Sequence, residues 1–375
     1  MKWTFRKIIW YDKPSKVIKV KKIFLFGFYG YGNLGDEILL EKSLRLLSEY
    51  DDISRVTVLS PKIPKISGEN FKFELSNVSK YDFLKLLKTI NSCDLVIGGG
   101  GGIFQDETSL RSFLYYSTLV KHALLIKKPV LLLAQSLGPL KNNISRRIMK
   151  KILQSDLVYP VMRDPVSYRY SKLFSKNTLL SADLAFEIDD DKEKGFQEKD
   201  SEKISLVIKE PINSDDFFNI IESMGFKKID LLLFFPKEEE KIALKNLDKL
   251  RNRFEVSVSI GYNRIVNSIA TSSLVVTQRL HGAILSLIFS TKFISPKNPK
   301  IVRTFIEFPY PGFTDFNSSF ELVGAIKSLE KFDFDNYRET VLETFSRRLI
   351  NVRKLLNFFL ETKYITKNLI FEPKT

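Results

Sequence analysis

The feature that most constrains this chain is a repeated unit: a short apolar segment, then a glycine-bearing polar corner, then an amphipathic helix. The first unit has its apolar segment at 22–27, its corner at 28–37 and a predicted helix from Asp36 or Glu37 to Ser48. Apolar residues recur in that helix at helical spacing, which gives it one buried face. Segments that are apolar throughout, without alternation, indicate parallel strands of a sheet that helices cover on both faces.

The same unit recurs to the end of the chain. Further strands of the first half are predicted at 56–59, 95–98, 130–134 and 157–161, with helices at 81–90, 110–126 and 145–154. A second series of strands is predicted at 204–208, 229–235, 254–258, 273–277 and 293–295, followed by a long amphipathic helix over about 335–362. This pattern predicts an α/β protein with two similar halves.

Length and local charge suggest where the halves divide. A chain of 375 residues favours about two domains. Residues 189–203 are charged and poor in core residues, which is typical of a linker. We therefore predict two Rossmann-like parallel-sheet domains that face one another across a cleft. The expected parts are an N-terminal extension at 1–20, a first domain at 21–188, the linker at 189–203, a second domain at 204–331, and a C-terminal helix and tail at 332–375.

Composition narrows the partners and excludes some chemistry. The net charge of +15 is spread over many lysines, so it favours anionic partners without choosing among nucleic acid, phosphorylated metabolites and anionic membrane. The sequence contains no basic helix or aromatic RNA-binding motif, so nucleic acid is not a predicted partner. One cysteine, Cys93, and two histidines offer neither an intramolecular disulfide nor a ligand cluster, so no metal or other cofactor is predicted.

The sequence predicts a cytoplasmic protein. No apolar run approaches the roughly 20 residues that span a bilayer, and the N-terminus has no secretory apolar region. Residues 1–10 alternate basic with aromatic or aliphatic side chains and include Trp3 and Trp10. Two alternatives are open for this extension: it rests on the inner face of the cell membrane as a peripheral anchor, or it packs on the first domain.

The corner at 27–35 is a candidate for ligand contact. Its glycines let backbone amides approach a ligand, and the helix start that follows can receive an anion. Gly30, Gly32 and Gly35 fit the pattern G-x-G-x-x-G, but no acidic residue ends a second strand in the register of a dinucleotide site. Two roles are open to Asp36. It caps the helix, worth about 1 kcal/mol, or it points into the cleft to orient or deprotonate a hydroxyl.

Five consecutive glycines, Gly98–Gly102, form the next corner. A turn needs one or two glycines, so we expect a ligand against this backbone; the alternative is a mobile hinge. Gln105 and Asp106 follow and are expected to hydrogen-bond a polyol. Gln135 and Arg163 stand at the ends of the next two strands. Polar residues at successive strand ends predict one ligand cleft along the edge of the sheet.

Arg279 and His281 occupy the matching corner of the second half, between an apolar strand and an apolar helix. Arginine offers a planar fork to carboxylate or phosphate, and histidine supplies a second charge or carries a proton. The alternative is a surface arginine beside a core histidine. Arg163 and Arg279 are expected to face one another across the cleft and, with Lys300, to bind a substrate carrying phosphate and carboxylate. For each cation alone, a surface salt bridge is the competing interpretation.

Taken in order, seven motifs of the chain resemble those of the polysaccharide pyruvyl transferase family, over about residues 22–307. They are Tyr29–Glu37, Gly98–Asp106, Gln135–Pro139, Arg163–Ser167, Ser181–Asp183, Arg279–His281 and Pro299–Ile301. The resemblance implies a fold similar to the GT-B glycosyltransferases, with the site between two domains. It also implies a bacterial enzyme of cell-wall or exopolysaccharide synthesis, which transfers the enolpyruvyl group of phosphoenolpyruvate to sugar hydroxyls, forms a pyruvate ketal and releases phosphate.

The resemblance places Asp36, Arg163, Arg279, His281 and Lys300 at the family's active-site positions, and the other candidates come from the local patterns above. Catalytic roles fall to Asp36, His281 and Arg163. Substrate-binding roles fall to Arg279, Lys300, Gly32, Asn33, Gly35, Gly99, Gly100, Gly101, Gln105, Asp106 and Gln135. Protonation of the donor's methylene carbon makes the neighbouring carbon electrophilic, and the reaction needs a positioned proton carrier and cations for the developing charge. We predict His281 or an arginine on the acid side and Asp36 as the partner of the attacking hydroxyl.

Three positions depart from the family's usual residues. Gln278, Ser136 and Asn298 stand where members usually carry methionine, glycine and aspartate, which affects the expected acceptor more than the reaction. The acceptor is predicted to be a nucleotide-linked or lipid-linked saccharide. Two other interpretations compete: a GT-B-type glycosyltransferase that uses a nucleotide sugar, and a catalytically inactive sugar-phosphate binding protein.

Overall fold

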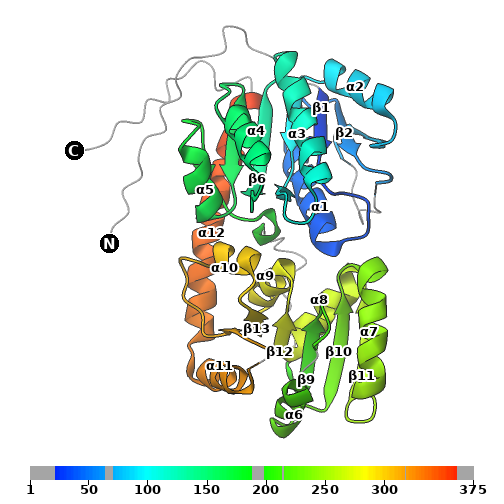
Figure 1. Ribbon diagram of the computed structural model, residues 1–375, viewed down its shortest axis with the longest axis vertical. Helices are drawn as coiled ribbons and strands as arrows, with labels where there is room; N and C mark the ends of the chain where they lie inside the picture. The colour runs from blue at the N-terminus through cyan, green and yellow to red at the C-terminus, as the bar shows by residue number, and fades with distance from the viewer. Residues whose placement is uncertain (1–21, 64–70, 188–197, 213–214, 317, 361–375) are drawn as a thin grey trace, which may run out of the picture.

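Two parallel sheets, each flanked by helices, make up the protein in this computed structural model (Figure 1). The structure describes residues 22–63, 71–187, 198–212, 215–316 and 318–360. The predicted extension at 1–20 and the tail from 361 lie outside these residues, and contact of the extension with a membrane therefore stays a prediction. Within the described ranges, no helix combines the length and the apolar character needed to cross a bilayer.

The first sheet has the strand order β3-β2-β1-β4-β6-β7-β8, with β5 paired to β6 outside this path. Its strands are β1 (Lys22–Phe26), β2 (Arg55–Leu59), β3 (Glu74–Val78), β4 (Leu95–Gly98), β5 (Gly101–Phe104), β6 (Val130–Leu137), β7 (Val158–Met162) and β8 (Leu179–Leu180). Its helices are α1 (Leu34–Ser48), α2 (Phe83–Ser92), α3 (Leu110–Leu125), α4 (Asn143–Leu153), α5 (Pro165–Lys172) and the short η1 (Leu184–Phe186).

The second sheet has the order β11-β10-β9-β12-β13-β14. Its strands are β9 (Asp200–Val207), β10 (Lys228–Leu233), β11 (Glu255–Ile260), β12 (Ser272–Thr277), β13 (Lys292–Pro296) and β14 (Phe313–Thr314). The helices are α6 (Asp215–Ser223), α7 (Pro236–Leu250), α8 (Tyr262–Thr271), α9 (Leu280–Ile288), α10 (Pro299–Thr304), α11 (Ser319–Lys331) and α12 (Phe334–Leu360). In each sheet the winding reverses once, between β1 and β4 and between β9 and β12, and such a reversal leaves a crevice at the carboxyl ends of the strands.

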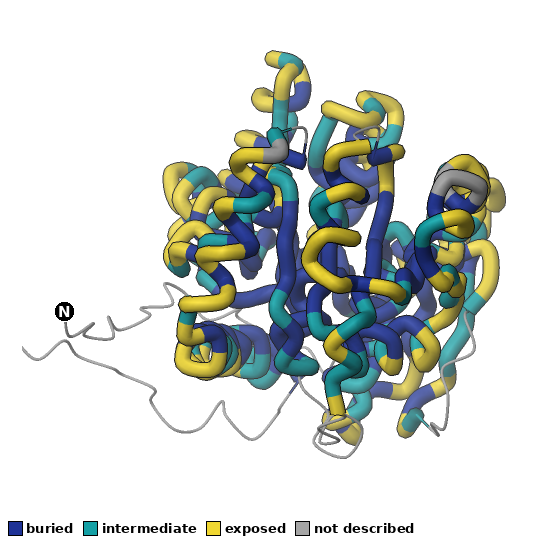
Figure 2. Tube along the Cα trace, turned by 90° about the horizontal axis from the view of Figure 1, so that it is seen from below, coloured by how far each residue is buried: buried dark blue, intermediate teal, exposed yellow. Residues whose placement is uncertain are grey.

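Strand β1 shows why its residues are apolar without alternation. Ile23 and Leu25 belong to one buried cluster, whereas Phe24 and Phe26 belong to a second cluster on the opposite face of the sheet. Both faces are covered by helices, so neither set of side chains meets water. Figure 2 shows this arrangement as buried strands in the middle of the molecule, with exposed residues on the outer faces of the helices.

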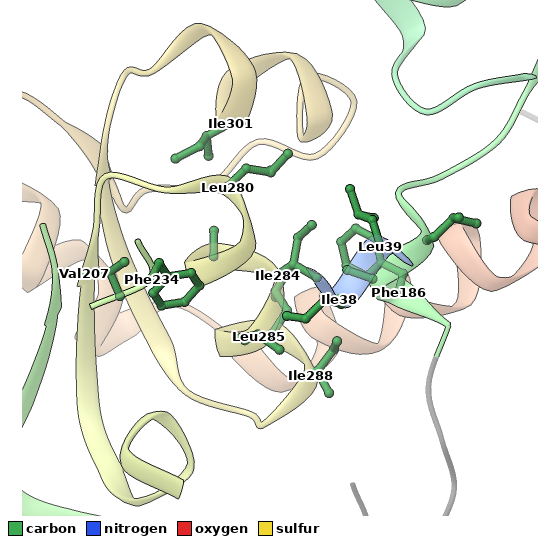
Figure 3. Close-up of a cluster of buried hydrophobic side chains, with 14 of the residues drawn as sticks. Ile38, Leu39, Phe186, Val207, Phe234, Leu280, Ile284, Leu285, Ile288 and Ile301 are labelled. Atoms are coloured by element: carbon green, nitrogen blue, oxygen red, sulfur yellow. The ribbon is translucent and has the colours of Figure 1, made fainter. Parts of the chain in front are cut away.

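The two sheets share one hydrophobic cluster. Ile38 and Leu39 of α1, together with Phe186, pack against Ile284 and Ile288 of α9 in that cluster (Figure 3). Helix α12 adds a polar connection, because it begins beside the second sheet and returns to the first. Its Asn351 Nδ2 donates to the carbonyl oxygen of Leu180 at 2.8 Å, and Arg353 Nη2 lies 2.6 Å from Glu187 Oε1. The cleft is therefore closed by packed side chains along part of its length.

The structure corrects several predicted boundaries. Strand β9 begins at Asp200, so the last residues of the predicted linker at 189–203 are in the sheet, where Lys203 pairs in register with Lys228. The charge of this segment hid the strand, since Asp200 Oδ2 and Lys228 Nζ form an ion pair at 2.8 Å. The edge strand β3 was not predicted because its sequence, ELSNV, is polar and only its last residue is buried. Residues 188–197 lie outside the described ranges.

Candidate functional site

The glycine-rich corner after β1 is folded around a glutamate of helix α1. Glu37 Oε1 accepts hydrogen bonds from the backbone amides of Gly30, at 2.9 Å, and Gly32, at 3.1 Å. Both glycines have positive φ, +79° and +83°, which other residues rarely adopt. The amides expected to receive an anion are thus already bonded within the corner. Asn33 precedes α1 as its N-cap without a side-chain capping bond, and anion binding by this corner stays a prediction.

The five glycines are shared between two strands. Gly98 ends β4, and Gly101 and Gly102 begin β5. A side chain on Gly99 would overlap the hydroxyl of Tyr29, and one on Gly100 would press on Leu39, so protein side chains lie against this part of the run. The last two glycines instead lie next to charged side chains. A Cβ on Gly101 would lie 3.7 Å from Asp36 Oδ1, and one on Gly102 would lie 3.8 Å from Arg163 Nη2.

Three polar residues of the first domain make contacts within the protein. Gln135 is fully buried, and its Nε2 donates to the carbonyl oxygen of Gly99. Gln105 Oε1 accepts from the amide of Thr108 at 3.0 Å, which closes a local turn. The Asp106 carboxylate accepts from the amides of Lys141, at 2.7 Å, and Asn142, at 2.8 Å, and so holds the entry to α4. A polyol would have to compete with these bonds, and its binding by Gln105 and Asp106 stays a prediction.

Arg163, Asp183 and His281 form the buried centre of the site. Arg163 Nη1 lies 2.5 Å from Asp183 Oδ2, and His281 Nε2 lies 3.7 Å from Asp183 Oδ1. Burial opposes ionisation of Asp183, but the charge of Arg163 and the contact with His281 prevail and hold its pKa well below the ordinary range. Nε of Arg163 and Nε2 of His281 are buried, and neither has a hydrogen-bond partner among the described residues. A bound acceptor atom would satisfy such groups.

His281 reaches this centre from the second domain. It stands in the first turn of α9, and its ring lies directly against the backbone of Gly35 in the first turn of α1. Next to this contact, the amide of Leu34 donates to the carbonyl oxygen of Phe234 across the domains at 2.7 Å. The starts of two helices from different domains therefore meet, and Asp36 lies one residue beyond the meeting point.

Arg279 is held by Glu239, a residue that was not predicted to belong to the site. Both Nε and Nη2 of Arg279 contact Glu239 Oε1 of α7. The glutamate is almost fully buried, 1% exposed, and its second oxygen accepts from the amide of Phe235 at 2.7 Å. A carboxylate fixed by a backbone amide orients the guanidinium, because the planar fork matches it in a defined direction.

Asp36 and Lys300 complete the charged cluster. Burial raises the pKa of Asp36, although His281, Lys300, Arg163 and Arg279 each act to lower it. Lys300 has an exposed side chain by accessible surface. Its pKa is nevertheless lowered. The main cause is desolvation of the ammonium group by the surrounding protein, and the second is the charge of Arg163. These mutual effects show that the cations of both domains act on one carboxyl group. The structure thus brings together Asp36, Arg163, Arg279, His281 and Lys300.

A second charged group joins the domains beside this cluster. Arg303 of α10 places Nη2 3.1 Å from Asp164 Oδ1, 2.6 Å from Ser167 Oγ and 2.8 Å from the carbonyl oxygen of Leu137. Ser136 Oγ also donates to Asp164, at 2.6 Å. Ser136 therefore supports the interdomain bond, which is a structural use for this departure from the family's usual residues.

Comparison with known proteins agrees with this geometry. The sequence profile described as polysaccharide pyruvyl transferase matches residues 33–295. The chain belongs to this family. It is therefore an enzyme, a transferase of polysaccharide biosynthesis. The matched region includes Asp36, Arg163, Asp183, Arg279 and His281, whereas Lys300 lies just beyond it. None of the curated proteins is similar enough in sequence to count as a match.

Solved structures show the fold that this chain shares with other proteins. The Anabaena protein HepE, in complex with UDP and glucose, is 11% identical, with a TM-score of 0.57 over 92% of this chain and 100% of its own. A putative UDP-N-acetylglucosamine 2-epimerase from Listeria monocytogenes is 12% identical, with a TM-score of 0.59 over 92% of this chain and 98% of its own. The UDP-GlcNAc 2-epimerase of Neisseria meningitidis, bound to UDP-GlcNAc, is 11% identical, with a TM-score of 0.56 over 89% of this chain and 100% of its own. The predicted GT-B-like fold is confirmed.

The roles of Asp183, Glu239 and Arg303 in the site were not predicted from the sequence. Asp183 closes one of the seven motifs, but no role was assigned to it. Glu239 follows β10 at a helix start, which is the kind of corner that supplied the other candidates. It stands, however, among three consecutive glutamates after Pro236 and Lys237, and helix starts commonly carry such acidic residues. Arg303 lies three residues beyond Lys300, and only its contact with Asp164 distinguishes it from other surface arginines.

Proposed function

We propose that this pyruvyl transferase takes phosphoenolpyruvate as its donor and forms a pyruvate ketal on two hydroxyls of a saccharide. The observation that carries the proposal is the cluster of Arg163, Arg279 and Lys300, contributed by both domains around Asp36. A donor with phosphate and carboxylate presents two anionic groups, and guanidinium groups bind such oxyanions in pairs of parallel hydrogen bonds. The buried Nε of Arg163, which has no hydrogen-bond partner among the described residues, supports anion binding at the same place.

The reaction is balanced in protons without a cofactor. The methylene carbon of the donor gains a proton, the first sugar hydroxyl attacks the neighbouring carbon and loses its proton, and the bond to phosphate breaks. The second hydroxyl then attacks that carbon, and its proton leaves with the phosphate. One proton is thus returned for each proton supplied. The residues have only to position the reactants, carry the proton and stabilise developing charge.

Asp36 and His281 are the proposed proton carriers. The raised pKa of Asp36 brings its proton affinity closer to neutral pH, where a carboxyl group is a more effective base toward a hydroxyl. His281 lies next to Asp183, whose lowered pKa keeps its carboxyl ionised. We assign the acid role to His281 and the base role to Asp36. Arg163, held by Asp183, stays charged and stabilises the departing phosphate.

One competing function is favoured by a specific observation. The similar structures include complexes with UDP, glucose and UDP-GlcNAc, so a nucleotide-sugar glycosyltransferase is the alternative for the same fold. Their identities of 11% carry the fold alone. The cluster around Asp36 favours phosphoenolpyruvate, because it surrounds a proton-carrying carboxyl with cations from both domains.

The test is a product assay. Wild-type protein is incubated with phosphoenolpyruvate and a panel of nucleotide-linked and lipid-linked saccharides, and each mixture is read by released phosphate and by the mass of the saccharide. We expect phosphate release with a mass increase of one pyruvyl ketal on at least one acceptor. Transfer of a sugar from a nucleotide sugar to the same acceptors, with no phosphate released from phosphoenolpyruvate, would replace this proposal with the glycosyltransferase.

A further inference from the structure

A polar cavity lies beside the charged cluster at the reversal point of the second sheet. Its volume is about 300 Å³, and its wall includes Lys209, Gln278, Lys297, Asn298, Asp315 and Phe316. These residues follow the carboxyl ends of β9, β12, β13 and β14. In parallel sheets, ligands bind outside the carboxyl ends of strands where the winding reverses. The cavity occupies that place in the second sheet.

Gln278 fixes the shape of this cavity. Its side-chain Oε1 accepts from the backbone amides of Lys209, at 2.6 Å, and Glu210, at 2.7 Å. The backbone amide of Gln278 donates to the carbonyl oxygen of Val207 at 2.9 Å. These bonds tie the segment after β9 to the end of β12 across the reversal point. Methionine, the residue usual in the family, could not accept two such bonds. The glutamine is therefore a structural device particular to this wall of the cavity.

The cavity differs from the charged cluster in its balance of positive and negative side chains. Two lysines, Lys209 and Lys297, are matched by two carboxyl groups, Glu210 and Asp315, so the formal charges of the wall sum to zero. A diphosphate would be repelled by the two carboxylates, and it has no hydrogen-bond donor to offer them. A sugar ring presents hydroxyls that donate as well as accept, and it can use ammonium and carboxylate partners together. Phe316, Pro211 and Pro296 supply apolar surface for the C–H bonds of the ring.

The cavity wall is connected to the second-domain residues of the charged cluster. Gln278 directly precedes Arg279, and Asn298 Oδ1 accepts from the amide of Lys300 at 2.9 Å. The charge of Lys209 is also among those that lower the pKa of Lys300. Each second-domain cation of the charged cluster is therefore attached to a residue of the cavity wall. A saccharide of more than one ring is the kind of ligand that could contact both the cavity wall and these neighbouring cations.

We propose that this cavity binds a neutral sugar ring of the acceptor, next to the ring that receives the ketal. The proposal rests on the proposed function for the identity of the acceptor, and its test is chosen to be independent of donor chemistry. The expected acceptor has at least two sugar units, and Gln278 acts as a positioning residue for its binding.

The experiment measures saccharide binding in the absence of phosphoenolpyruvate. Full-length protein is titrated with methyl glycosides and disaccharides of hexoses and N-acetylhexosamines, and binding is followed by saturation-transfer NMR, with UDP as competitor. Lys297→Ala removes a cavity charge whose side chain is 65% exposed, so folding is preserved. Lys245→Ala, on the exposed side of α7, is the matched control. Gln278→Ala removes the acceptor oxygen, and Gln278→Glu restores one. Thermal melts check the fold of each variant.

We expect disaccharides to bind more tightly than single rings, with affinity about tenfold lower in Lys297→Ala and in Gln278→Ala. Gln278→Glu and Lys245→Ala should bind as wild type does, and UDP should not compete. Three results would overturn the proposal: no binding by any saccharide of the panel, equal affinity in Lys297→Ala and wild type, or displacement of the saccharide by UDP. Saccharide binding without any reaction of phosphoenolpyruvate would uphold the cavity and reject the proposed donor, so the two failures are distinguishable.

Discussion

The imidazole ring of His281 packs on the backbone of Gly35, so that a residue of one domain rests on the first helical turn of the other. A Cβ on Gly35 would overlap Nδ1 of His281. Gly35 has no positive φ, and its need for glycine therefore comes from this approach alone. The contact sets His281 next to Asp183 and the start of α1 next to the cleft. The two proposed proton carriers are thus positioned by one interdomain contact.

Gly35→Ala should displace the ring of His281 without preventing folding. We expect kcat for ketal formation to fall by about 100-fold, the loss typical of a misplacement of about 1 Å at a catalytic group. Steady-state kinetics measure the rate, and circular dichroism measures the fold. Gly324→Ala is the matched control, because Gly324 is an exposed glycine of α11 with no atom within 4 Å of its missing Cβ. Equal rates in the two variants would show that the contact with His281 does not matter.

Asp36→Asn should separate stability from activity. The raised pKa means that ionised Asp36 costs stability at pH above its ordinary value of 3.8, and the amide removes this cost. We expect a higher Tm at neutral pH together with a kcat about 100-fold or more lower. In the wild type, activity should fall as the pH drops through this raised pKa. Full activity in Asp36→Asn would exclude Asp36 as the base.

Glu239→Gln should weaken donor binding through Arg279. The amide oxygen can still accept from Phe235, so the helix start is preserved, but the charge that orients the guanidinium is lost. We expect KM for phosphoenolpyruvate to rise about tenfold, the effect of one weakened charged hydrogen bond. Arg279→Met should raise it further. A KM unchanged in Glu239→Gln and raised in Arg279→Met would show that Arg279 needs no positioning residue.

Arg303→Met should destabilise the association of the two domains. It leaves the buried Asp164 without its cation, a loss of about 3–5 kcal/mol, which chemical denaturation would measure. Burial opposes ionisation of Asp164, but Arg303 and two serine hydroxyls lower its pKa. A carboxyl with a lowered pKa stabilises the fold above its ordinary value of 3.8, and this contribution is lost as pH falls below that value. The acid-induced loss of stability should therefore be smaller in Arg303→Met. An equal slope with pH in both proteins would contradict this account of Asp164.

The repeated unit of the sequence predicted most of the fold for a physical reason. Both faces of strand β1 are buried, so apolar and polar residues do not alternate along it. This absence of alternation is what predicted a parallel sheet. The polar strand β3 and the charged start of β9 were not predicted, because their stability comes from pairing with neighbours rather than from apolar side chains. Asp200 with Lys228 is such a pair, and its two members are distant in sequence.

The cationic residues of the candidate site could be predicted from the sequence, but the residues that form ion pairs across the site could not. Arg163, Arg279 and Lys300 stand at strand ends, and topology brings such positions together. The contacts of Glu239 with Arg279 and of Arg303 with Asp164 depend on the angle between two domains, which no local pattern encodes. The glycine corner shows the opposite limit. Its glycine pattern predicted backbone amides free to bind a ligand, whereas in the structure two of these amides already donate to Glu37.

Phosphoenolpyruvate should bind between the domains, and calorimetric titration tests this expectation most directly. Phosphoenolpyruvate is titrated into wild type, Arg279→Met and Gly324→Ala, with UDP and UDP-GlcNAc titrated separately. We expect binding to wild type and Gly324→Ala, and an affinity about tenfold to 100-fold weaker in Arg279→Met. Binding of the nucleotide sugar with none of phosphoenolpyruvate, or equal binding of phosphoenolpyruvate to Arg279→Met and wild type, would contradict it.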